Sequence, residues 1–143
     1  MPAPQNIQTT NGGAHAGEAE AGDSITFTFV SAVNPDVVLS GWDGTATPVT
    51  FTLGQYSNND YAVARDPSSG AILWDLGAVG LNQDYVDDIA DFTNSQMTAS
   101  GSTVTIVLGT RSGTVNRVHT ADAMTWYTYH GTVTESGLPD LDF

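Results

Sequence analysis

Two short stretches of alternating side chains constrain the fold of this chain more than any other feature. In residues 24–29, one isoleucine and two phenylalanines alternate with one serine and two threonines, and residues 103–108 alternate in a similar way. Side chains of a β-strand point in turn to its two faces, so a period of two predicts strands with one buried face. We expect both strands to line one shared core with Ile25, Phe27, Phe29, Val104, Ile106 and Leu108.

Weaker patterns predict the rest of the fold. Further strands are expected at residues 6–10, 49–53, 59–65, 71–74 and 126–129, the fourth of them pairing back on the third as a hairpin. In residues 84–92, Tyr85, Ile89 and Phe92 recur at helical spacing behind Asp84, a favourable N-cap, which predicts a helix of one to two turns. Frequent turns rich in Gly, Pro, Asn and Asp then favour an all-β sandwich with one short helix.

The length and the missing cysteine limit the organisation of the chain. Its 143 residues fit one core, so we expect a single domain over residues 1–143. Residues 1–22 are expected to form an extended N-terminal segment that buries little within the domain, and residues 136–143 an extended tail. Without cysteine the chain has no disulfide, no thiolate metal ligand and no cysteine nucleophile.

Acidic side chains dominate the charge. Sixteen Asp and Glu residues stand against three arginines and no lysine, which gives a formal net charge of −13. Nucleic-acid binding depends on Lys and Arg, and anionic membrane surfaces repel such a chain, so neither partner is expected. No apolar run approaches the ~20 residues of a membrane-spanning helix. Partners are expected to be neutral, basic or bridged by cations.

Several motifs are shared with a known family. They are the Gly-Asp turn and alternating strand of residues 21–29, the Asn-Pro loop of 33–37, the turn at 40–44, and the strands at 102–108 and 125–129. Through these residues the chain resembles bacterial and phage immunoglobulin-like domains of the Big type. The resemblance covers most of the chain and implies an all-β, immunoglobulin-like β-sandwich. Many relatives end in an Asp-x-x-Gly-Asn turn, whereas this chain ends with Asp140-Leu141-Asp142-Phe143.

The resemblance implies a structural or recognition module and not an enzyme. Such domains occur as single copies on the capsids and tails of tailed phages, and as repeats in secreted bacterial surface proteins. A single copy that begins at Met1 and shows no secretory signal favours the phage setting. We therefore expect a non-enzymatic virion accessory protein, a capsid decoration or tail-associated domain, with other virion proteins and copies of itself as partners. The alternative is a carbohydrate-binding or adhesive module of the bacterial cell surface, with glycans as partners.

The residues that could carry chemistry have simpler structural interpretations. Gly22-Asp23-Ser24 matches the opening of the GDS-type esterase block, but no histidine follows an aspartate by three residues, as those enzymes require. The acidic residues at 84–91 lack the glycine turn of a calcium loop. The alternating acid and alanine residues at 18–23 are more simply interpreted as a soluble, exposed stretch. We predict no catalytic residue, no metal site and no cofactor. A carboxylate pair at glycosidase spacing stays open, because that spacing is not visible in a sequence.

Aromatic side chains are the better surface candidates. Trp126 and Tyr127 are adjacent on one strand and must point to opposite faces, so either Trp126 or the Tyr127/Tyr129 pair faces away from the core. Trp42 and Trp126 also have an interpretation as core residues. Tyr and Trp are common at interfaces and stack on sugar rings. We expect the interaction residues to be Trp42, Tyr56, Tyr129, Leu141 and Phe143, the last two as part of a docking tail.

Overall fold

The computed structural model describes residues 1–56, 59–118 and 122–134. Its elements are β1 (Pro4–Thr10), β2 (Ser24–Phe29), α1 (Pro35–Val38), β3 (Thr47–Gly54), β4 (Tyr61–Arg65), β5 (Ala78–Gly80), β6 (Ile89–Ser100), β7 (Thr103–Val107), β8 (Thr110–Ser112), β9 (Thr125–Thr128) and β10 (Gly131–Thr134). The expected all-β sandwich with one short helix is confirmed. The described part of the chain has no helix with the length and apolar character needed to cross a bilayer.

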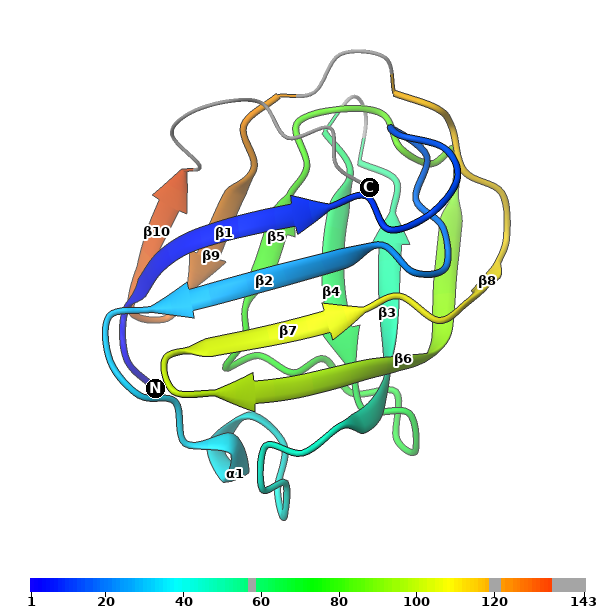
Figure 1. The fold of residues 1–143 in the computed structure, drawn as a ribbon. Coiled ribbons are helices and arrows are strands. Elements are labelled where there is room, and N and C mark those ends of the chain that lie inside the picture. Colours follow the sequence, from blue (N-terminus) through cyan, green and yellow to red (C-terminus); the bar gives the residue numbers. More distant parts are fainter. Residues whose placement is uncertain (57–58, 119–121, 135–143) are drawn as a thin grey trace.

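All ten strands belong to one antiparallel sheet that folds over itself like a barrel (Figure 1). β1, β2 and β7 form a front layer, and β3, β4, β5 and β9 form a back layer that runs at a steep angle to it. β6 joins the layers: one of its edges pairs with β3, and the other pairs first with β8 and then with β7. At the open side of the sheet, Cα atoms of β1 and β10 approach within 8 Å, but no strand pairing joins them.

The core lies between the two layers. All six side chains expected there are at most 3% exposed, and Ile25 pairs with Ile106 across β2 and β7, which confirms the assigned faces. Trp126 of β9 enters from the back layer and is fully buried. Its ring centroid lies 5.1 Å from that of Phe27 and 5.0 Å from that of Phe29. This aromatic contact ties the back layer to the front layer.

The N-terminal segment contributes to this core, contrary to the expectation that it buries little. β1 pairs with β2, and Ile7 is fully buried. The loop between these strands is organised by Asp23, whose buried carboxylate accepts hydrogen bonds from the backbone N–H groups of Gly12 and Gly13 at 2.9 Å and of Glu20 at 3.0 Å. Burial raises the pKa of Asp23 despite these donors.

The helix expected at residues 84–92 is wrong. Residues 84–88 form an irregular loop, and β6 begins at Ile89 with Ala90 and Phe92 buried and Asp91 on the opposite face. The helical spacing of the aromatic and aliphatic residues is coincidental, because Ile89 is exposed and the buried Ala90 and Phe92 lie two residues apart on β6.

Among the described residues the one helix is α1, where a turn was expected. The side chain of Asn34 caps it by accepting a hydrogen bond from Asp36 N–H, and Pro35 occupies the first turn, where a missing N–H costs nothing. The hairpin expected at 71–74 is reduced to a single bridge between Ile72 and Arg65.

Candidate functional site

The outer surface of the back layer carries the exposed aromatic side chains. Tyr61 of β4 lies opposite Gly80 of β5, and Ala78, two residues earlier on β5, lies opposite Tyr127 of β9. Directly paired residues point to the same side of a sheet, as do residues two apart on one strand. Tyr61 and Tyr127 therefore share the outer face. We call this surface the aromatic face and define it by Tyr56, Tyr61, Trp74, Tyr127 and Tyr129.

Four of these side chains are largely open to solvent. Trp74 is 54% exposed, Tyr127 51%, Tyr56 71% and Tyr129 77%. They border two shallow depressions with Tyr127 as the shared wall. One, of about 210 Å³, is lined by Trp74, Gly77, Ala78, Tyr127, Thr128 and Tyr129. The other, of about 220 Å³, is lined by Tyr56, Asn59, Tyr61, Ala78, Val79, Gly80 and Tyr127. Neither lining contains a charged side chain.

Small residues let these rings lie close to the sheet. A Cβ atom on Gly54 would come within 2.1 Å of Cζ of Tyr61, so the Tyr61 ring occupies the space a side chain would take. Gly77 has φ +83°, and a Cβ there would meet the carbonyl oxygen of Tyr127 at 2.1 Å. Gly77 therefore has to be glycine, whereas a side chain at position 54 would displace the Tyr61 ring from the face.

The loop that carries Tyr56 is held by a buried acid. Asp60 accepts hydrogen bonds from the backbone N–H of Tyr56 at 3.2 Å and of Val86 at 2.8 Å. Its side chain is fully buried, and burial raises its pKa. Asp60 thus ties the Tyr56 loop to the 82–88 loop beside it.

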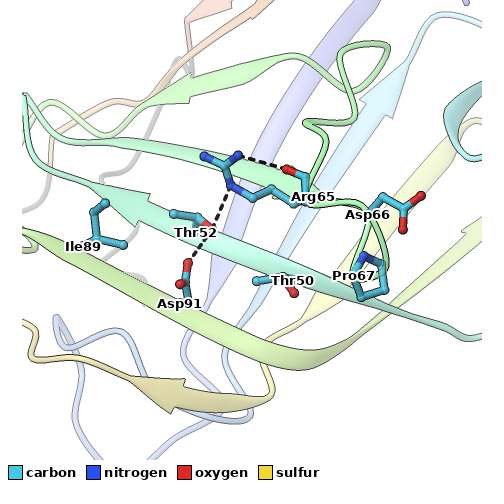
Figure 2. A pocket seen from close by; sticks show the side chains of 8 residues that line it. Thr50, Thr52, Arg65, Asp66, Pro67, Ile89 and Asp91 are labelled. Atoms are coloured by element: carbon cyan, nitrogen blue, oxygen red, sulfur yellow. Dashed lines mark hydrogen bonds between the residues drawn. The ribbon is translucent and has the colours of Figure 1, made fainter.

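A third depression on the back layer is polar. Its volume is about 360 Å³, and Figure 2 shows its lining: Thr50, Thr52, Arg65, Asp66, Pro67, Gly70, Ile89 and Asp91. Arg65 donates from Nε to Thr52 Oγ1 at 3.3 Å and from a terminal nitrogen to the Gly70 carbonyl at 3.1 Å. The Thr52 hydroxyl in turn donates to Asp91 Oδ1 at 2.6 Å. This chain of hydrogen bonds fixes the guanidinium over the sheet.

The residues expected to form interactions differ in their exposure to solvent. Tyr56 and Tyr129 are exposed on the aromatic face, as expected. Trp42 is 7% exposed and donates its indole N–H to the Thr45 carbonyl at 2.6 Å, so it belongs to the interior. Leu141 and Phe143 lie outside the described residues.

Sequence reasoning missed Trp74 and left Tyr127 undecided. Trp74 follows the Ile72 bridge and begins a turn, whereas a strand was expected at residues 71–74, and its side chain is exposed there. The alternation at Trp126 and Tyr127 required one of them to face outward, and the structure places Tyr127 there.

The residues considered for chemistry have structural partners instead. Gly22 turns the chain into β2 with φ +94°, and Ser24 is the first residue of that strand. In the 18–23 group, Glu18 pairs with Arg111 at 3.2 Å, and Glu20 Oε2 lies 3.2 Å from His15 Nδ1. The hydrogen bond from the His15 backbone N–H lowers the pKa of Glu20.

The acids at 84–91 do not share a helix face. Asp87 accepts a hydrogen bond from the Asn116 side chain at 3.0 Å, and Asp91 accepts one from Thr52. Within residues 1–56, 59–118 and 122–134, no three His, Asp or Glu side chains gather closely enough to hold a metal ion. His119 lies outside the described residues.

Comparison with known proteins assigns no family to the chain. No protein-family model matches it. No curated protein and no solved structure matches it either.

Proposed function

We propose that this chain is a non-enzymatic recognition module that binds through its aromatic face. The observation that carries the proposal is the gathering of four aromatic side chains, each more than half exposed, on one side of the back layer. Single exposed apolar residues are normal on a protein surface, whereas a contiguous group of them marks a binding surface. Tyr and Trp give a large contact area at low entropic cost, because they have few rotatable bonds.

A neutral carbohydrate chain is the ligand class that fits this surface best. The two aromatic depressions are shallow and uncharged, and they are lined by tyrosine and tryptophan side chains, on which the C–H face of a sugar ring can pack. The Asn59 side chain, whose Oδ1 accepts from the backbone N–H of Asn82, can donate its NH₂ group to sugar hydroxyls. A net charge of −13 disfavours polyanionic chains. This proposal develops the alternative of a carbohydrate-binding or adhesive module.

Docking on a larger assembly is the second candidate function. The resemblance to phage immunoglobulin-like domains supports a place on a virion, as a capsid decoration or a tail-associated protein. The exposed Trp and Tyr side chains favour it as well, because these residue types dominate the binding energy of protein–protein interfaces. The two functions are compatible if one surface holds the particle and the aromatic face meets a glycan.

Paired variants test the aromatic face. Trp74→Ser with Tyr127→Ser removes its two central rings, whereas Val30→Ser with Val107→Ser removes exposed apolar side chains from the front layer, where Val30 is 59% and Val107 42% exposed. Pull-down with insoluble cellulose, chitin and β-1,3-glucan should retain the wild type and the front-layer variant. The aromatic variant should bind at least about tenfold more weakly.

Two outcomes would redirect the proposal. Equal retention of both variants would show that the aromatic face is not the contact surface. Retention on none of the three polysaccharides would refute carbohydrate binding for these chains. Co-sedimentation with purified phage capsids or tails, lost in the aromatic variant, would then favour docking on the particle.

A further inference from the structure

The polar depression holds opposite charges that do not pair with each other. Arg65, Asp66 and Asp91 all line it. The ion pairs among the described residues are His15–Glu20 and Arg111–Glu18, so no carboxylate of that part of the chain lies within 4 Å of the Arg65 guanidinium. Arg65 is held instead by a hydroxyl and a carbonyl, both uncharged. In a chain with sixteen acids and three arginines, this arginine is kept apart from the carboxylates beside it.

Donors and acceptors therefore remain open on both sides of the cavity. One terminal nitrogen of Arg65 points away from both of its hydrogen bonds (Figure 2), and within the described residues it has no acceptor. Asp91 uses Oδ1 for Thr52, and its second oxygen has no donor in the same part of the structure. A ligand group that accepts from Arg65 and donates to Asp91 would satisfy both.

The polar depression and the aromatic face lie on the same side of the sheet. Arg65 and Tyr61 are four residues apart on β4, and positions an even number apart point to one face. Along the strand they are separated by about 13 Å, from a rise of about 3.3 Å per residue. A chain-like ligand can therefore reach both, but a single sugar ring cannot.

We propose that the polar depression is a subsite for the hydroxyl groups of a neutral sugar chain whose other rings pack on the aromatic face. Arg65 donates to, and Asp91 accepts from, hydroxyls of one ring. A hydroxyl both donates and accepts, which suits a cavity lined by both charges. A carboxylate-bearing sugar would face two aspartates against one arginine, so the neutral ring is favoured. This inference rests on the proposed carbohydrate-binding function and assigns the ligand a length and a direction along β4.

The composition of the chain makes a sharp experiment available. Its three arginine Nε–H and three tryptophan indole N–H signals can be followed by ¹H–¹⁵N NMR during titration with neutral hexasaccharides: cello-, laminari-, malto- and N-acetylchitohexaose. Trp74 should shift, while Trp42 and Trp126, which are buried and donate their indole N–H groups to the Thr45 and Leu76 carbonyls, should not. With the hexasaccharide that binds, Arg65 should also shift, and Arg111 and Arg117 should stay in place.

Matched substitutions then separate the subsite from the rest of the face. Arg65→Met should weaken binding of the hexasaccharide about tenfold, the effect of losing a charge-assisted hydrogen bond. Binding of the trisaccharide of the same sugar should be unchanged. Arg117→Met makes the same charge change at an arginine bonded to the Ala16 carbonyl and should have no effect. Arg65→Lys keeps the charge, loses the fork geometry and should also weaken binding. Unchanged Trp126 and Trp42 signals would show that each variant is folded.

The possible results divide clearly. A shift at Trp74 without one at Arg65, together with equal affinity of wild type and Arg65→Met, overturns the subsite and leaves the aromatic face as the binding surface. No shift at Trp74 or Arg65 with any of the four hexasaccharides overturns carbohydrate binding itself. Tighter binding of hexagalacturonate than of the neutral chains, lost in Arg65→Met, would mean that the depression takes a carboxylate and would refute the neutral ring.

Discussion

Replacing Trp126 by phenylalanine tests the link between the two layers. The change keeps a ring against Phe27 and Phe29 but removes the indole N–H, which donates to the Leu76 carbonyl at 2.7 Å in the buried interior. A buried carbonyl left without its donor costs about 1–3 kcal/mol. The smaller ring buries roughly 50 Å² less, which costs about 1 kcal/mol at ~25 cal/mol per Å². We expect Trp126→Phe to lower the free energy of unfolding by about 2–4 kcal/mol.

Trp42→Phe is the matched control. It removes the same atoms, but the Thr45 residue that accepts the Trp42 indole hydrogen bond is exposed, so water can replace the donor. The expected loss is about 1–2 kcal/mol. Urea unfolding followed by far-UV circular dichroism measures both variants, since tryptophan fluorescence is altered by the substitutions themselves. Equal losses for the two variants would refute the reasoning that the buried Leu76 carbonyl depends on Trp126.

Three further predictions concern the fold. Burial raises the pKa values of Asp23 and Asp60, so the folded state binds these two protons more tightly than the unfolded state. Lowering the pH from 7 to 5 also reduces the net charge, and both effects should raise the melting temperature. A lower melting temperature at pH 5 in calorimetry would contradict this. Phe27→Ala should cost ~3–5 kcal/mol in urea unfolding, and a loss below ~1 kcal/mol would contradict its place in the core. Deleting residues 1–10 removes β1 and buried Ile7, so the cooperative melting transition should disappear; an unchanged transition would show that β1 is dispensable.

The strands with large side chains on one face were predictable, and β6 was not. In β2 and β7 the alternation of bulky apolar and hydroxyl side chains permits one interpretation. The buried side chains of β6 differ in size, as Ala90 and Met97 show, and its apolar Ile89 is 51% exposed. The alternation of apolar and polar residues that identifies a strand is therefore not visible in the sequence of β6. Its position depends on pairing with β3 and β7, which are distant in sequence. Tertiary pairing decided between helix and strand where local pattern could not.

The sequence predicts that aromatic side chains form the candidate site, but it does not predict which residues belong to it. That one side of Trp126–Tyr127 must face outward follows from strand geometry alone. Which side faces outward depends on the Phe27 and Phe29 rings that receive Trp126, a contact across the core. The polar depression joins Arg65 of β4 to Asp91 of β6 through Thr52 of β3, so it exists only once three strands are in register.

The open seam between β1 and β10 bears on how this chain avoids polymerising. Unpaired strand edges are templates on which sheets of separate molecules fuse into aggregates. Here Cα atoms of the two end strands of the sheet approach within 8 Å, so each strand shields the other from pairing with another molecule. Pro2 and Pro4 further remove backbone donors from the β1 end. β8, off the main strand order, is only three residues long. A concentrated solution of the folded protein should therefore resist growth into fibrils, and assembly with other molecules should proceed through the faces and loops of the domain.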